Sequence, residues 1–325
     1  MSETNGPKTM WQSVRVAPRT SRLEKRALPK PGPSEVLIHV RVCGVCASEL
    51  HPWLSADGPQ EFGHEVVGEV VEVGAEVTGL EPPMRVTGLI HKGFAEYALA
   101  PAEHVIPVPE SLSDRAALGE PLSCVISGMR RTAIDLGDKV AVIGLGYMGL
   151  LTLQAARLKG PAELFAIDTR EVSRQRALEY GADGVLEPTE IPASLILNAW
   201  GDIPKGYGLD VAIEAAGNAH ALALAGRMVK EHGILSIVGY HQGEPVPIDM
   251  ELWNWKALSV LNAHERRHDY QMDCMARGLR LVEAAKIDTA SLVTHSYSLE
   301  DVDDAYAALL DKPDDFVKSV ITISD

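Results

Sequence analysis

Alternating apolar and polar residues fill the first third of the chain in short runs. This period-two pattern is typical of half-buried strands, because successive side chains of a strand point to opposite faces. Gly68 and Gly74 interrupt the pattern where we expect bulges or turns. The expected strands are residues 35–42, 66–77, 94–98 and 104–108. The pattern therefore predicts a β-rich region with no helix of any length.

The pattern changes near residue 120, and from residue 138 apolar strands alternate with helical stretches. Strands that alternate with helices indicate βαβ units and a parallel sheet. The expected strands here are residues 139–143, 164–168, 209–214, 234–238 and 257–262, and the expected helices are 150–158 and 174–180. Two further helical stretches (272–285 and 302–310) and a last strand (317–323) follow, and no repeat of fixed period is present.

A glycine-rich turn joins the first strand of this second region to its helix. The segment 144–149 fits G-x-G-x-x-G, and Asp168 ends the next strand, 19 residues after Gly149. This context is that of a dinucleotide-binding loop, in which the pyrophosphate lies at the helix N-terminus. Asp168 would accept hydrogen bonds from the adenosine ribose and repel a 2′-phosphate, which favours NAD over NADP. Arg170 instead favours NADP, because an arginine at this position can bind the 2′-phosphate. The candidate cofactor-binding residues are Gly144, Gly146, Tyr147, Met148, Gly149, Asp168, Arg170, Val238 and Lys318.

Length and charge narrow the class of protein. A chain of 325 residues exceeds one ordinary core, so two domains are expected. The net charge of −15 argues against a nucleic-acid partner, which needs a basic face. No apolar stretch reaches the ~18 residues of a membrane span, and residues 1–16 lack a signal-peptide core. Four cysteines form no disulfide framework, so we expect a cytoplasmic protein that is not membrane-bound.

Potential metal ligands gather between residues 43 and 65. Cys43 and Cys46 form a C-x-x-C pair, and His64 and Glu65 follow Cys46 within twenty residues. A lone C-x-x-C is more often a buried or redox pair, and a lone histidine is more often structural. Together they supply the thiolate, imidazole and carboxylate ligands that Zn²⁺ takes in proteins, which indicates a zinc site.

The chain resembles the zinc-dependent alcohol and polyol dehydrogenases of the medium-chain dehydrogenase/reductase superfamily. The pattern G-H-E-x-x-G-x-x-x-x-x-G-x-x-V is matched by residues 63–77, and C-G-x-C-x-[ST]-D-x-H is matched at 43–51 except for Glu49. The resemblance covers nearly the whole chain, including 94–97 and 316–318. It implies an α/β protein with a GroES-like β-rich catalytic domain (1–123 and 263–325) and a Rossmann NAD-binding domain with a doubly wound parallel sheet (124–262).

The resemblance also implies roles for individual residues. Cys46 and His64 match zinc ligands, Glu65 matches a carboxylate that is a ligand in some members and a displaced neighbour in others, and Glu120 matches the third ligand position. Ser48 and His51 match a proton relay, so Cys46, Ser48 and His51 form the expected catalytic set. Cys43, Cys124 and Cys274 match no ligand and are expected to be packed thiols.

Two departures from the family pattern carry consequences. Glu49 replaces the usual aspartate beside the ligand histidine and is one methylene longer, which puts its hydrogen bond to His64 in question. No cysteine lies between Cys46 and Cys124, so the lobe that binds a structural zinc in many relatives is missing. One catalytic zinc and no structural zinc is therefore expected in each subunit.

The implied activity is hydride transfer between a secondary alcohol and NAD, in a homodimer or homotetramer. Zinc would act as a Lewis acid on the substrate oxygen, and the proton would leave through Ser48 and His51. Polar residues among the expected pocket candidates favour a polyol, sugar or cyclitol. Those candidates are Trp53, Phe94, His241, Trp253, Trp255, Asn262, His264, Glu265 and Arg266. Two alternatives stay open: a zinc-free quinone or enoyl reductase of the same superfamily, and a non-enzymatic protein that retains the fold.

Overall fold

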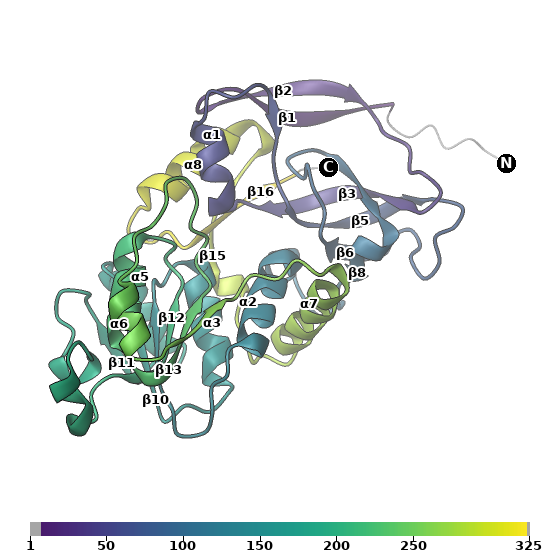
Figure 1. Cartoon of the computed structure of the whole chain (residues 1–325). Helices are drawn as coiled ribbons and strands as arrows, with labels where there is room; N and C mark the ends of the chain where they lie inside the picture. Colours follow the sequence, from purple (N-terminus) through teal and green to yellow (C-terminus); the bar gives the residue numbers. More distant parts are fainter. Residues whose placement is uncertain (1–7, 324–325) are drawn as a thin grey trace. The chain divides into compact units, whose positions relative to one another are not determined.

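The computed structural model describes residues 8–323, which divide into two compact units (Figure 1). Unit 1 comprises the chain up to Ser123 and from Met275 onward, and unit 2 is Cys124–Cys274. The sequence pattern places the second boundary earlier, after residue 262. Hydrogen bonds attach the intervening segment to the rest of unit 2, since Arg131 Nη1 donates to His264 O at 2.6 Å and Arg130 Nη1 to Asp273 Oδ2 at 2.7 Å.

Unit 1 is rich in β-structure and contains two sheets. A three-stranded sheet has the order β2 (Thr20–Ala27), β1 (Thr9–Ala17), β4 (Gln60–Glu61). The larger sheet has the order β15 (Val293–Tyr297), β16 (Lys318–Thr322), β3 (Glu35–Gly44), β5 (Glu65–Val73), β6 (Arg85–Gly88), β8 (Val105–Pro107), and β7 (Tyr97–Pro101) also pairs with β3. Its helices include α1 (Leu50–Leu54) and α8 (Val302–Asp311). The expectation of no helix in the first third is therefore wrong for α1, a single short turn that lacks helical periodicity.

The core of unit 1 is built from the inward faces of its strands and from α8. Trp53 and Phe94, both placed among the pocket candidates, are 2 % and 1 % exposed and belong to this core, as does Tyr306. The Trp53 ring stacks on Tyr306 with centroids 5.3 Å apart. Both aromatic residues therefore pack in the core, and their contact with a substrate stays a prediction.

Unit 2 contains a six-stranded parallel sheet. Its order is β11 (Gly184–Leu186), β10 (Glu163–Ile167), β9 (Lys139–Ile143), β12 (Leu209–Glu214), β13 (Val229–Ile237), β14 (Ser259–Asn262). Numbered within the sheet, this is the order 3-2-1-4-5-6 of a Rossmann fold, which confirms that prediction. Its helices are α3 (Tyr147–Arg157), α4 (Glu171–Glu179), α5 (Ala219–Met228) and α6 (Met250–Trp255), together with most of α2 (Gly119–Arg131) and the first turns of α7 (His268–Glu283).

A buried lysine closes the C-terminal end of α5. Lys256 has no exposed surface, and its Nζ donates to the carbonyl oxygens of Gly226, Arg227 and Val229 at 2.8–3.0 Å. The last carbonyls of a helix lack partners within the helix and carry partial negative charge, so a cation stabilises them. Among residues 8–323, no helix combines the length and the apolar character that crossing a membrane would require.

Candidate active site

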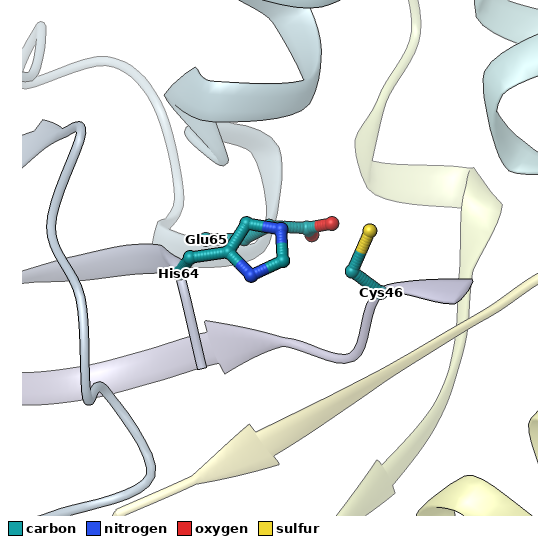
Figure 2. Close-up of side chains that lie close together, drawn as sticks. All are labelled: Cys46, His64 and Glu65. Atoms are coloured by element: carbon teal, nitrogen blue, oxygen red, sulfur yellow. The ribbon is translucent and has the colours of Figure 1, made fainter. Parts of the chain in front are cut away.

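Two neighbouring strands bring the potential metal ligands together. β3 and β5 are antiparallel, and their register pairs Gly44 with Glu65. Cys46 follows the end of β3 by two residues, while His64 directly precedes β5. One ligand atom from each of Cys46, His64 and Glu65 lies within 4.8 Å of the other two (Figure 2). In tetrahedral zinc sites ligand atoms are about 3.5 Å apart, so small side-chain shifts would bring these three onto one ion.

Glu49 makes the hydrogen bond that its extra methylene puts in question. Its Oε1 lies 2.8 Å from His64 Nδ1 and accepts the Gly63 N–H at 2.9 Å. With Nδ1 occupied, Nε2 is the ring nitrogen left to face Cys46 and Glu65, as Figure 2 shows. A carboxylate at Nδ1 fixes the tautomer of a ligand histidine and raises its basicity. The glutamate therefore serves in the place of the usual aspartate.

The electrostatics of the three side chains favour a cation between them. Burial alone would lower the pKa of His64, but hydrogen bonding to Cys46 and Glu49 outweighs it and raises that pKa to about 12. Ser48 Oγ donates to Cys46 Sγ at 3.2 Å, which stabilises a thiolate. A metal ion would take the place of this His64 proton, because ligands bind metals in their deprotonated forms.

Glu65 is paired with a buried lysine. Its Oε1 accepts Lys318 Nζ at 2.7 Å, and its Oε2 lies 2.6 Å from the same nitrogen without hydrogen-bond geometry. Lys318 Nζ also donates to Val45 O at 2.9 Å. Because Oε2 is buried without a hydrogen bond, one oxygen is left for a further cation. The donor set and this unsatisfied atom fit zinc.

Glu120 lies in the first turn of α2 and is not one of the three clustered ligands among the described residues. Burial alone would lower the pKa of Lys318. The charge of Glu65 raises this pKa, and the charge of Glu120 makes a smaller contribution in the same direction. The structure thus brings Glu65, rather than Glu120, to Cys46 and His64. Lys318, expected at the cofactor, lies beside Glu65 and is 4 % exposed. Its contact with a cofactor stays a prediction.

The two candidate relay residues lie on consecutive short helices after Cys46. Ser48 belongs to the 3-10 turn Ala47–Glu49, and His51 belongs to α1. Ser48 is half-buried beside the Cys46 sulfur, whereas His51 is exposed. A proton that starts near the metal ligands and ends in solvent would pass through groups placed in this order.

The glycine loop of unit 2 has the geometry that a phosphate requires. Gly144 has φ +93°, and a Cβ on Gly149 would meet Gly144 O at 1.8 Å, so both positions need glycine. A Cβ on Gly146, at the start of α3, would meet nothing within 4 Å. This open space before a helix N-terminus is where a phosphate is stabilised by backbone N–H groups. Asp168 Oδ2 accepts the Leu145 N–H at 2.7 Å, and its Oδ1 accepts the Arg170 N–H at 2.8 Å.

Several of the remaining pocket candidates have partners within unit 2. Trp253 is 8 % exposed and packs in the core of unit 2, so its contact with a substrate stays a prediction. Glu265 accepts Arg267 Nη2 at 2.8 Å, and hydrogen bonds from Arg267 lower the pKa of Glu265 to about 2. His241 Nε2 lies 2.9 Å from Glu214 Oε2. The polar run therefore makes internal contacts, which weakens its use as evidence for a polyol.

Sequence reasoning missed the contact of Tyr306 with Glu49 and the pairing of Lys318 with Glu65. Tyr306, which contacts Glu49, lies in a helix 257 residues later, and Lys318 lies 253 residues after Glu65. Apolar periodicity marks Tyr306 only as a core residue. A buried tyrosine is expected to find a hydrogen-bond partner, but the sequence does not say which.

Comparison with known families gives matches in both units. Residues 32–110 match the alcohol dehydrogenase GroES-like domain, and residues 148–279 match the zinc-binding dehydrogenase family. The combination confirms a GroES-like unit followed in sequence by a Rossmann unit, as the β-rich pattern and the glycine loop predict.

Three similar proteins cover most of the chain. L-threonine 3-dehydrogenase of Pyrococcus abyssi is 31 % identical over 83 % of this chain and 86 % of its own. Sorbitol dehydrogenase of Halalkalibacterium halodurans is 28 % identical over 93 % and 96 %. A crystal structure described as a zinc-binding dehydrogenase of Sinorhizobium meliloti bound to NADP is 28 % identical, with a TM-score of 0.82 over 97 % of this chain and 100 % of that one.

Proposed function

Because the chain belongs to the zinc-dependent alcohol and polyol dehydrogenase family of the medium-chain superfamily, we propose that it oxidises a secondary hydroxyl group and passes the hydride to NAD⁺. An oxidoreductase of the alcohol dehydrogenase type acts on CH–OH donors. The convergence of Cys46, His64 and Glu65 within 4.8 Å is the observation that carries the proposal. A zinc-free reductase would have no use for that donor set.

Each group at the site has a part in this reaction. Zinc, when bound, supplies Lewis acidity toward the substrate oxygen. Cys46, His64 and Glu65 hold it, while Glu49 keeps the Nδ1 proton of His64 in place. Ser48 takes the hydroxyl proton of the substrate, and His51 delivers a proton to solvent from its exposed position. The hydroxyl of Ser48 can both accept and donate, as a relay requires.

The cofactor proposal is NAD rather than NADP. The Asp168 carboxylate is fixed by two backbone N–H groups and adds a negative charge where a 2′-phosphate would lie. The Sinorhizobium meliloti neighbour binds NADP, so cofactor choice varies within the family and depends on the residues of this chain. Arg170, whose backbone N–H donates to Asp168 Oδ1, is the residue that would favour NADP.

A secondary alcohol with a second polar group is the proposed substrate class. The named relatives act on sorbitol and on carbon 3 of L-threonine, and both molecules carry a polar group beside a secondary hydroxyl. The pairing of Glu65 is compatible with the same substrate class. The Lys318 ammonium offsets the negative charge that the Glu65 carboxylate would add to the metal. Zinc can expand to five ligands, which would admit a neighbouring oxygen or nitrogen of the substrate.

We predict one zinc per chain. Among residues 8–323, the structure groups only Cys46, His64 and Glu65 in a way that could hold a metal. Elemental analysis of the purified protein is expected to give a zinc-to-chain ratio near one. Dialysis against a chelator should remove both the zinc and the activity, and added Zn²⁺ should restore both. A ratio near two would contradict the single site, and activity that survives complete zinc removal would contradict the proposed function.

We also predict a preference for polyhydroxylated secondary alcohols. Matched pairs isolate the two requirements: 2-propanol against 1-propanol for the position of the hydroxyl, and 2,3-butanediol against 2-butanol for the second polar group. The value of kcat/KM with NAD⁺ is expected to be higher by about tenfold for the first member of each pair, the effect of about 1.4 kcal/mol of transition-state binding. Equal or better turnover of 1-propanol would leave only a general alcohol dehydrogenase.

A further inference from the structure

A buried chain of hydrogen bonds runs from α8 to His64. The Tyr306 hydroxyl donates to Glu49 Oε2 at 2.7 Å, and Glu49 Oε1 lies 2.8 Å from His64 Nδ1. Tyr306 has no exposed surface, and Glu49 is 9 % exposed. The two oxygens of the Glu49 carboxylate therefore have separate tasks. One contacts the candidate ligand, and the other is held by the tyrosine.

A glutamate at position 49 needs a hydrogen bond that restrains its carboxylate. Its side chain has one more rotatable bond than aspartate, and immobilising it costs more conformational entropy. The Gly63 N–H at 2.9 Å holds only Oε1, the oxygen that also serves His64. The Tyr306 hydroxyl is what fixes the rotation of the carboxylate about its last bond.

Tyr306 is itself held in one orientation. Its ring contacts three aromatic side chains, with centroids 5.3 Å away for Trp53 and 6.0 Å away for both Phe62 and Phe94. One turn earlier on α8, Asp303 Oδ1 accepts Trp53 Nε1 at 2.8 Å and Ser21 Oγ at 2.7 Å. These contacts tie α8 to the helix that carries His51 and to β2, so the hydroxyl has little freedom to turn away from Glu49.

We propose that Tyr306 is a positioning residue of the metal site: its hydroxyl fixes the Glu49 carboxylate, and Glu49 thereby keeps His64 Nε2 directed at the metal. The inference rests on the proposed zinc-dependent function and deepens it. Burial raises the pKa of the Tyr306 phenol well above its ordinary value, and the charge of Glu49 raises it further, so the hydroxyl stays a proton donor at neutral and alkaline pH. Partners one step beyond the ligands change metal affinity by 10- to 100-fold when they are removed, and Tyr306 acts one step further out.

A purely structural role for the same hydrogen bond predicts a different result. If the Tyr306 hydroxyl only satisfied a buried carboxylate, its loss would destabilise the metal-free and zinc-loaded protein equally. By linkage, the affinity of the folded protein for zinc would then be unchanged. Zinc release and the difference in Tm between the two forms therefore separate the two roles.

The test compares Tyr306→Phe with Ser21→Ala. Both variants remove one hydroxyl that donates to a carboxylate in unit 1, but the Ser21 partner, Asp303, does not contact His64. The rate of zinc transfer from the loaded protein to a colorimetric chelator is expected to rise about tenfold for Tyr306→Phe, the lower end of the effect of such partners. It should stay within about twofold of wild type for Ser21→Ala, while the Tm of the metal-free protein falls by a similar amount in both.

A double-mutant cycle with Glu49→Gln completes the test. If Tyr306 acts through the charged carboxylate, adding Tyr306→Phe to Glu49→Gln should change zinc release by less than about twofold. Equal zinc release from wild type and Tyr306→Phe would overturn the positioning role, and so would a full effect of Tyr306→Phe in the Glu49→Gln background. A wild-type protein that binds no zinc would instead refute the proposed function, so the two failures are distinguishable.

Discussion

Cys46→Ala is expected to lower kcat for alcohol oxidation by at least about 1000-fold, with zinc content falling well below one per chain. Cys46 would bring a full negative charge to the metal as a thiolate, and it lies beside His64, whose pKa it raises. Without it, His64 and one oxygen of Glu65 are left to hold the metal. Loss of a Lewis acid removes several kcal/mol of transition-state stabilisation, and each 1.36 kcal/mol is a factor of ten in rate.

The binding of NADH checks that this loss is local. Because the glycine loop and Asp168 belong to unit 2 and Cys46 to unit 1, fluorescence titration of Cys46→Ala should give a Kd for NADH close to that of wild type. Cys124→Ser is the matched control, because it removes a thiol outside the metal cluster and should keep zinc and most of the activity. Wild-type turnover by Cys46→Ala would remove this residue from the metal site.

Asp168→Ser is expected to lower the preference for NAD⁺ over NADP⁺ by about 10- to 100-fold, expressed as the ratio of the two kcat/KM values. The substitution removes a fixed negative charge and the acceptor for the ribose hydroxyls, and each tenfold step needs only about 1.4 kcal/mol. Affinity for NAD⁺ should fall, while affinity for NADP⁺ should rise or hold.

Asp168→Asn separates charge from loop structure in this experiment. The amide oxygen can still accept the Leu145 N–H, so the glycine loop keeps that support while the charge is lost. If charge decides the preference, Asn and Ser should shift it alike. A shift with Ser alone would assign the effect to the loop, and a wild-type enzyme that already prefers NADP⁺ would direct attention to Arg170.

Local patterns predicted most of unit 2. Its strands are apolar runs bounded by turns, and the loop before α3 needs glycine for reasons that the structure shows at Gly144 and Gly149. The clustering of Cys46, His64 and Glu65 was also predicted, because these residues lie within twenty residues of one another and β3 and β5 are adjacent in the sheet. Short-range spacing in the sequence was sufficient to predict this cluster.

Features that depend on distant parts of the chain were not predicted. β1 escaped detection because it buries the polar residues Gln12 and Arg15, which are 5 % and 1 % exposed. Arg15 donates to the backbone carbonyls of Ser55 and Gly58. These tertiary contacts stabilise a buried arginine, whereas the sequence pattern alone would place an arginine on the surface. The sequence also did not indicate that the rings of Trp53 and Phe94 pack in the core of unit 1.

The ion pair between Glu65 and Lys318 would affect the net charge of a metal bound by Cys46, His64 and Glu65. A thiolate and a carboxylate together would neutralise a dication, leaving an electrically neutral centre with little pull on an incoming oxygen. The Lys318 ammonium, held 2.6–2.7 Å from both oxygens of Glu65, restores one positive charge in a place where water cannot screen it. With this pairing, a metal bound by Glu65 would retain the electrophilic character of one with a neutral ligand in that position.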